Sequence, residues 1–367
     1  MTVWPEVNYG HTGLDAAFAR RDVYGVAPQE RRRSKQRLQV AIVGAGGVAR
    51  AKWIPALRRL QDVGEPVDAC GVADLRSDTR KATAAGAGCR GHESFAALLE
   101  DARPDLALVL TSDAAHVEVA RQAIDRDIPA LVEKPLSRDY FEARDLALAA
   151  QDRKVLLAAV ANKRFSPPYA LAKKLVDAGA LKAAPTLFSG KFTLGYPYVD
   201  LLEGGTVHLL DLMGWFMGRI ARLHARGVHD ADGKLLSAVI SARFESGAIG
   251  SLITSSAGLS FKPWERVELF GSNAFLLVDD QFETTLFDDE TGPAKSWRPS
   301  VPNTLMFDEE FGGYAGQLEN VLDAVRGLAP LASSGVDGAA AVGLIEATRR
   351  SIETGAEIDI GRGGLAP

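Results

Sequence analysis

A short apolar run, Leu38–Val43, leads directly into the glycine-rich segment Gly44-Ala45-Gly46-Gly47-Val48-Ala49. Between a strand and a helix, this G-x-G-x-x-A pattern predicts a tight turn at Gly44 and close approach of the main chain to a phosphate at Gly46. The small side chain of Ala49 allows the helix to pack against the strand, and the helix N-terminus offers free N–H groups to an anion. The segment therefore predicts an α/β domain that binds a dinucleotide through these residues.

Short apolar runs then alternate with helical patterns. We expect helices at Val48–Leu60 (with a kink at Pro55), Ala115–Arg126 and Tyr140–Gln151. We expect strands at Val67–Ala73, Leu106–Leu110, Pro129–Glu133 and Val155–Val160. Because alternating strands and helices form parallel βαβ units, residues 38–160 are predicted to form a Rossmann domain with a doubly wound parallel sheet.

The pattern changes after about residue 160. Helices are expected at Pro167–Ala178, Tyr314–Arg326 and Gly338–Glu353, and several strand-like runs between 221 and 278 are joined by short glycine-containing turns. This pattern predicts a second α+β domain, 161–367, with a mostly antiparallel open sheet. Residues 1–37 form an N-terminal extension, either a tail or an arm onto another subunit, in which Glu30–Arg37 is interpreted as a solvated basic linker.

Composition excludes several classes of protein. The net charge of −5 argues against a nucleic-acid partner, and no apolar run approaches the ~20 residues that span a bilayer. Two cysteines exclude a disulfide framework and favour a reducing, cytoplasmic compartment. No signal peptide and no metal-ligand spacing among the histidines are apparent.

Asp74 ends the second predicted strand, where a carboxylate can accept hydrogen bonds from the hydroxyls of an adenosine ribose. A carboxylate there would repel a 2′-phosphate, so we expect NAD as the cofactor. Arg76 is the residue that could instead pair with that phosphate, which leaves NADP open.

A lysine stands in Glu133-Lys134-Pro135, at the carboxyl end of a predicted parallel strand. Ligands of open α/β sheets bind outside such strand ends. A lysine there can orient a hydroxyl or carbonyl oxygen and stabilise negative charge on it.

Together these motifs resemble the Gfo/Idh/MocA family of NAD(P)-dependent oxidoreductases, which act on sugars, cyclitols and related polyols. The resemblance extends over nearly all of residues 38–360 and includes the motifs Thr111 with His116, Asn162–Arg164, His208-x-x-Asp211 and Gly343–Ala347. It implies that Thr111, Ser112, His116 and Glu133 lie near the cofactor. It further implies that Lys134 orients the substrate, that Arg164 borders its pocket, and that the Lys134–Pro135 peptide is a candidate cis bond.

By the same resemblance, His208 is the general base for oxidation, or the acid for reduction. The family usually has an aspartate four residues earlier, where this chain has Gly204. Asp200 or Glu203 could supply the carboxylate, while Asp211 matches a following aspartate of structural character. Tyr196 and Tyr198, in the preceding loop, are candidates for contacts with a sugar.

The sequence thus predicts hydride transfer between nicotinamide and a sugar, cyclitol or related polyol, with Lys134 and His208 as catalytic residues. Two alternatives stay open: a sugar enzyme that retains NAD without net redox change, and a non-catalytic dinucleotide-binding regulator. The resemblance also implies a homodimer or homotetramer, assembled through the sheet of the second domain.

Overall fold

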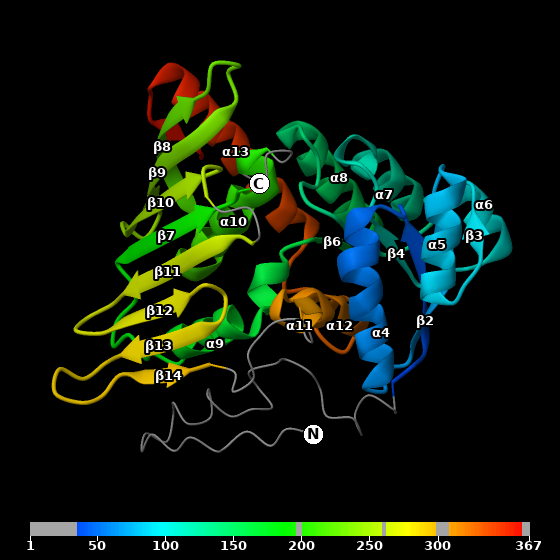
Figure 1. The fold of residues 1–367 in the computed structure, drawn as a ribbon, viewed down its shortest axis with the longest axis horizontal. Helices are drawn as coiled ribbons and strands as arrows, with labels where there is room; N and C mark the ends of the chain where they lie inside the picture. The colour runs from blue at the N-terminus through cyan, green and yellow to red at the C-terminus, as the bar shows by residue number, and fades with distance from the viewer. Residues whose placement is uncertain (1–34, 196–199, 259–261, 299–307, 362–367) are drawn as a thin grey trace. The chain divides into compact units, whose positions relative to one another are not determined.

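The computed structural model describes residues 35–195, 200–258, 262–298 and 308–361. They form two compact units (Figure 1). The Rossmann unit contains the described residues of 35–162 and 308–342. The second unit contains those of 163–298 and 343–361.

A six-stranded parallel sheet forms the Rossmann unit, in the order β3-β2-β1-β4-β5-β6. Its strands are β1 (Leu38–Val43), β2 (Val67–Ala73), β3 (Gly91–His92), β4 (Leu106–Val109), β5 (Ala130–Val132) and β6 (Leu157–Ala159). β1 and β4 consist almost entirely of buried apolar residues, as expected for strands with both faces covered. The predicted doubly wound sheet is confirmed.

Helices connect these strands. They are α4 (Ile54–Asp62), α5 (Ser77–Ala87), α6 (Phe95–Asp101), α7 (His116–Ile124) and α8 (Tyr140–Arg153). The first helix differs from the expected kink at Pro55, because a π-helical turn, Ala49–Trp53, precedes α4 and Pro55 lies in the first turn of α4. Proline is tolerated at that position, since the N–H that it lacks is not needed there.

The C-terminal region corrects the expected domain division. We expected 161–367 to form one domain, but residues 308–342 belong to the Rossmann unit. Helix α12 (Tyr314–Val325) contributes Leu318, Val321 and Leu322 to the same apolar core as β1 and α4. Two further helices are α11 (Asp308–Phe311) and α13 (Gly335–Thr354), and α13 belongs to the second unit from Gly343 onward.

Lys35 corrects the prediction of a solvated linker up to Arg37. Its side chain is 7% exposed and lies 3.3 Å from Glu65, 2.8 Å from Asp323 and 3.8 Å from Glu319. The ammonium is therefore held by a cluster of carboxylates that Arg326 also joins, 2.6 Å from Glu65. Residues 1–34, the tail or arm of the sequence interpretation, lie outside the described residues.

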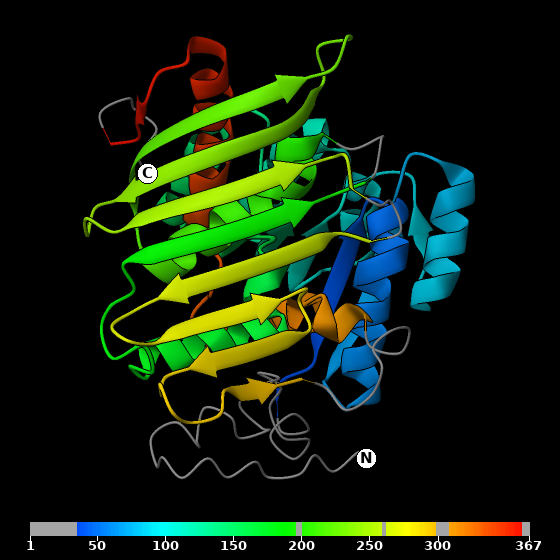
Figure 2. The same cartoon turned by 60° about the vertical axis from the view of Figure 1, so that its left-hand side comes forward.

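The second unit contains a nine-stranded sheet in the order β14-β13-β12-β11-β7-β10-β9-β8-β15, which faces the reader in Figure 2. Its strands are β7 (Leu187–Thr193), β8 (Ile220–His229), β9 (Leu235–Phe244), β10 (Ile249–Ser255), β11 (Trp264–Phe270), β12 (Phe275–Asp279), β13 (Glu283–Phe287), β14 (Lys295–Trp297) and β15 (Ile358–Asp359). Only β7 and β10 pair in parallel, so the mostly antiparallel sheet is confirmed.

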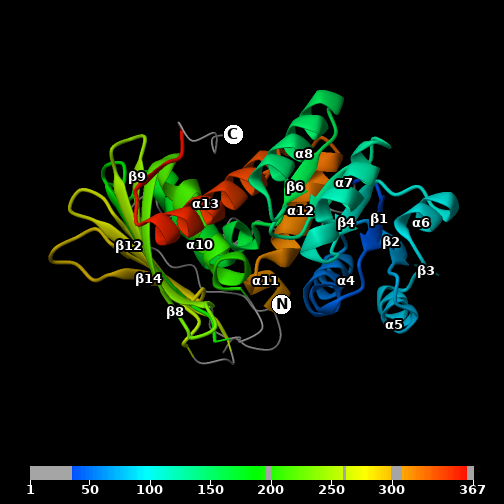
Figure 3. The ribbon, with the colours of Figure 1, turned by 90° about the horizontal axis from the view of Figure 1, so that it is seen from above.

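One face of this sheet is covered by helices. Helices α9 (Pro167–Asp177) and α10 (Val207–Met217) pack on it, and Figure 3 shows α10 and α13 along that face. On β9 and β10, buried residues alternate with exposed ones, so the opposite face is open in the chain as described. Among the described residues, no helix is long and apolar enough to cross a membrane.

Candidate functional site

The glycine-rich loop has the geometry that a dinucleotide requires. Gly44 has φ +100°, and a Cβ there would overlap the carbonyl oxygen of Leu110. A Cβ at Gly46 or Gly47 would meet no atom within 4 Å, which leaves room for a pyrophosphate at the start of the helix. Ala45 and Ala49 are fully buried beneath the loop. These residues fit a dinucleotide, as predicted.

Asp74 connects the end of β2 to this loop. Its Oδ2 accepts a hydrogen bond from the backbone nitrogen of Ala45 at 2.7 Å, and its Oδ1 accepts one from that of Arg76 at 2.8 Å. The Arg76 side chain is two-thirds exposed, with its Nε 4.0 Å from Asp74. The carboxylate therefore has a fixed orientation and keeps lone pairs for a ribose, while Arg76 extends into solvent.

His116 joins the ends of two neighbouring strands. The imidazole is 1% exposed, with Nδ1 2.8 Å from the carbonyl oxygen of Pro135 and Nε2 3.2 Å from that of Thr111. Both ring nitrogens thus face main-chain carbonyl oxygens, one after β4 and one after β5, and its place near the cofactor stays a prediction. Ser112 precedes the 3-10 turn Asp113–Ala115 that leads into α7, and the Thr111 hydroxyl is buried without a hydrogen-bond partner among the described atoms.

Glu133 fixes the backbone that carries Lys134. Its carboxylate is buried, and Oε1 accepts a hydrogen bond of 2.8 Å from the indole nitrogen of Trp53. Oε2 accepts one of 3.0 Å from the backbone nitrogen of Lys134. The Lys134–Pro135 peptide is cis, as expected, and the Lys134 side chain is half-buried. Glu133 is thus a positioning residue whose carboxylate is already occupied, and the Trp53 contact was not anticipated from sequence.

In the second unit, His208 lies in the first turn of α10, directly after a π-helical turn, Leu202–Thr206. A Cβ at Gly205 would overlap the ring of Phe192 on β7, so only glycine allows this turn to pack so closely. The hydroxyl of Thr206 lies 2.8 Å from that of Thr254 on β10. The π-turn was not anticipated, because the pair Gly204-Gly205 indicates it only once the contact with Phe192 is known.

Arg164 does not present a free guanidinium to a substrate. Its Nε and Nη2 lie 2.8 and 2.5 Å from the two carboxylate oxygens of Asp211, and both side chains are at most 10% exposed. This bidentate pair ties the 3-10 turn Asn162–Phe165 to α10, one turn after His208. The preceding residue, Lys163, was not singled out from sequence; it forms a buried ion pair with Glu265 at 2.7 Å.

Asp200 and Glu203 have separate roles at the start of the His208 helix. Asp200 Oδ1 accepts hydrogen bonds from the backbone nitrogens of Leu202 and Glu203, at 2.8 and 2.9 Å, so Asp200 is a helix cap. Arg349 of α13 lies 2.7 Å from Glu203 and 3.3 Å from Asp200. Tyr196 and Tyr198, the proposed sugar contacts, lie outside the described residues.

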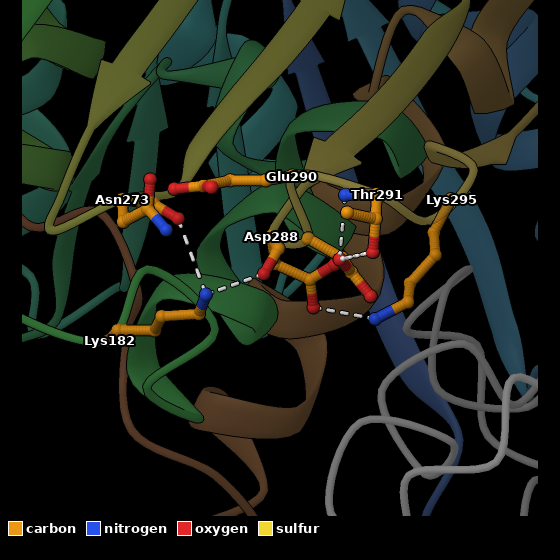
Figure 4. A pocket seen from close by; sticks show the side chains of 7 residues that line it. Lys182, Asn273, Asp288, Glu290, Thr291 and Lys295 are labelled. Atoms are coloured by element: carbon orange, nitrogen blue, oxygen red, sulfur yellow. Dashed lines mark hydrogen bonds and ion pairs between the residues drawn. The ribbon is translucent and has the colours of Figure 1, made fainter.

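The second unit also contains a cavity of about 620 Å³, whose lining residues lie between Lys182 and Lys295 in the sequence (Figure 4). Lys182 donates to the carbonyl oxygens of Asn273 and Asp288, and Lys295 pairs with the Asp288 carboxylate at 2.5 Å. Hydrogen bonds from Thr291 lower the pKa of Asp289. None of the predicted site residues lines this cavity. Among the residues that the structure describes, no group of His, Cys, Asp and Glu could hold a metal ion.

Comparisons with known proteins agree with this geometry. Residues 38–161 match the NAD-binding Rossmann fold of the Gfo/Idh/MocA oxidoreductase family, and residues 201–360 match its C-terminal alpha/beta domain. The chain is 27% identical to myo-inositol 2-dehydrogenase of Thermotoga maritima, over 70% of this chain and 80% of that protein. It is 24% identical to UDP-N-acetylglucosamine 3-dehydrogenase of Acidithiobacillus ferrooxidans, over 82% of this chain and 93% of that protein.

Among solved structures, an oxidoreductase from Agrobacterium radiobacter in complex with NAD+, L-tartaric acid and magnesium has the same fold. The TM-score is 0.78 at 19% identity, and the match covers 89% of this chain and 99% of that one. The two matching domains, in the order and with the folds that the structure has, show that this chain belongs to the Gfo/Idh/MocA family of NAD-binding oxidoreductases.

Proposed function

We propose that this protein is an NAD-dependent dehydrogenase, or reductase in the reverse direction, of a secondary alcohol in a sugar, cyclitol or related polyol. The observation that carries the proposal is the combination, in one unit, of an open glycine loop with Lys134 held at the end of β5 by Glu133. Relatives named for inositol and for a sugar nucleotide support the substrate class.

NAD, when bound, supplies the hydride acceptor at C4 of its nicotinamide. The glycine loop and the helix that follows bind its pyrophosphate, and Asp74 binds the adenosine ribose. Lys134 orients the substrate oxygen and stabilises negative charge on it. His208 accepts the hydroxyl proton as the carbinol carbon loses hydride, and it returns that proton in the reduction. NAD is preferred over NADP because the Asp74 carboxylate would repel a 2′-phosphate.

The proposal extends to the compartment, the oligomeric state and the partner of the enzyme. We place it in the cytoplasm, as a homodimer or homotetramer that assembles through the open face of the nine-stranded sheet. Its partner is the small-molecule substrate.

The test is an assay of purified protein with NAD and NADP against a panel of sugars and inositols, followed at the NADH absorbance. Lys134→Ala and His208→Ala should each lower kcat by at least about a hundredfold, as expected for loss of a general acid–base or an oxyanion-stabilising group. Lys81→Ala and His229→Ala, which alter exposed side chains, are the matched controls.

The outcomes separate the alternatives. Product formed without net NADH would indicate an enzyme that retains its cofactor. NAD binding without turnover of any substrate would contradict the dehydrogenase and favour a regulator. Turnover that survives both Lys134→Ala and His208→Ala would mean that the assigned catalytic residues are wrong.

A further inference from the structure

The π-helical turn before α10 sets which residues share a face of the helix with His208. In this turn the backbone N–H of Val207 donates to the carbonyl oxygen of Leu202, five residues earlier. Across such a turn, residues five apart occupy the neighbouring positions that residues four apart occupy in an α-helix. Glu203 stands five residues before His208, so the two share one face of the helix.

Burial follows the same geometry. Glu203, Gly204 and His208 are half-buried, whereas the intervening residues Gly205–Val207 are buried, as are Leu209 and Leu210. One partly open stripe therefore runs along the helix through Glu203 and His208. In this stripe, Gly204 has no side chain, so Glu203 is the acidic residue on the N-terminal side of His208.

Asp200 caps the start of the helix, and its side chain also lies 3.3 Å from Arg349. Its Oδ1 accepts the backbone N–H groups of Leu202 and Glu203, as an N-cap does. Glu203 is held by another element, because its Oε1 lies 2.7 Å from Nη2 of Arg349 on α13. The Glu203 side chain is 22% exposed, so this ion pair is shielded from solvent in part.

We propose that Glu203 is a positioning residue that orients the imidazole of His208 and stabilises its protonated form, and that Arg349 sets how strongly it does so. This inference rests on the proposed function. In the oxidation, the substrate hydroxyl proton moves to His208 as the carbinol carbon loses hydride to the nicotinamide. Glu203 stays ionised and compensates the charge of the imidazolium.

Charged groups are linked to the His208 helix through three elements of the unit. Glu203 and Asp211 lie on that helix, and Asp200 caps its start. Arg164 pairs with Asp211 from the turn Asn162–Phe165, and Arg349 of α13 pairs with Glu203 and with Asp200. Removal of a carboxylate should disfavour the imidazolium, and removal of a guanidinium should favour it. The two changes at Glu203 and Arg349 therefore have opposite signs.

The experiment measures kcat/KM against pH for NAD reduction in the full-length protein, with Glu203→Gln and Arg349→Gln. The limb on which His208 loses its proton should move to lower pH by about one unit in Glu203→Gln, since a neighbouring opposite charge shifts a pKa by about one unit or more. It should move to higher pH in Arg349→Gln. Glu203→Asp should restore part of the wild-type profile, and Asp232→Asn, at an exposed turn between β8 and β9, should leave the limb in place.

A second measurement does not depend on turnover. Titration of the His208 imidazole by ¹⁵N–¹H NMR, assigned with His208→Gln, should show the same two opposite shifts in the protein without substrate. If the pH profile of kcat/KM and the NMR titration of His208 both stay unchanged in a folded Glu203→Gln protein, the pairing is overturned. Shifts of the same sign in Glu203→Gln and Arg349→Gln would overturn it as well. Lack of NAD reduction by the wild type would instead contradict the proposed function, and the titration would still test the pairing.

Discussion

The carboxylate of Asp74 accepts a hydrogen bond from the backbone nitrogen of Ala45 at 2.7 Å, so the end of β2 and the glycine loop are joined through the side chain that we assign to the ribose. Its second oxygen accepts the N–H of Arg76. One charge therefore orders the loop and prepares the cofactor site. Loss of that charge should affect both the shape of the loop and the choice of cofactor.

Asp74→Asn should weaken NADH binding about fivefold, because hydrogen bonds to a charged group contribute about 1 kcal/mol more than neutral ones. NADPH binding should stay constant or improve, since the repulsion of its 2′-phosphate is removed. Calorimetric titration of both cofactors measures the ratio. The control is Asp68→Asn, on β2, which removes one partner of an exposed ion pair with Arg37. An unchanged preference for NADH would disprove the role of Asp74.

Trp53→Phe should lower the free energy of unfolding by about 1–3 kcal/mol, because it leaves the buried carboxylate of Glu133 without its indole donor. The ring volume is largely kept, so the edge-to-face contact with Tyr314 persists in part. Urea unfolding followed by circular dichroism measures the effect. Trp215→Phe, at a half-buried site on α10, should cost less. Equal costs for the two substitutions would argue that the hydrogen bond contributes nothing.

Lys163→Met should destabilise the protein by about 3–5 kcal/mol, because it leaves the buried Glu265 carboxylate without its ammonium partner. The double variant Lys163→Met/Glu265→Gln should regain much of that loss, since the unpaired charge is then removed. Denaturant midpoints of the two single variants and the double variant form the cycle. Additive losses would contradict the pairing.

The Rossmann sheet was predictable because its signals are local. The run Leu38–Val43, the glycine loop and the terminal Asp74 each carry their own pattern, and β1 and β2 are found as expected. The partner of α12 was not predictable. Its apolar stripe, with Leu318 and Leu322, specifies a buried helix but not the core that it joins, which the tertiary fold decides.

The candidate site also contains residues that the sequence could indicate and residues that it could not. Lys134 and His208 could be singled out because each belongs to a motif that stands in the order expected for the family. The positions of Arg164 and Glu203 could not, because an ion pair between distant segments and a π-turn leave no periodic trace in the sequence. The glycine pair at 204–205 indicates an unusual backbone only after Phe192 is known to pack against it.

The two cysteines should make stability fall at high pH. Burial is the main cause that raises the pKa of Cys70, on β2, and of Cys89, after α5, from 9.0 to about 11. A raised pKa means that the folded state favours the neutral thiol, so this contribution is complete below about pH 9 and is lost as the pH rises towards 11. Thermal midpoints between pH 8 and 11 should fall less in Cys70→Ala and Cys89→Ala. Parallel curves for wild type and variants would contradict the assignment.

The open face of the nine-stranded sheet should mediate assembly. Ile253 on β10 and Val239 on β9 lie directly opposite each other and are 52% and 53% exposed, which leaves paired apolar side chains on one face. Ile253→Lys/Val239→Lys should therefore reduce the mass measured by light scattering from a multiple of 39.2 kDa towards that of one chain. Leu148→Lys, at an exposed apolar residue of α8 in the other unit, should leave the mass unchanged. A wild-type monomer, or an oligomer that survives the double substitution, would exclude this face as the interface.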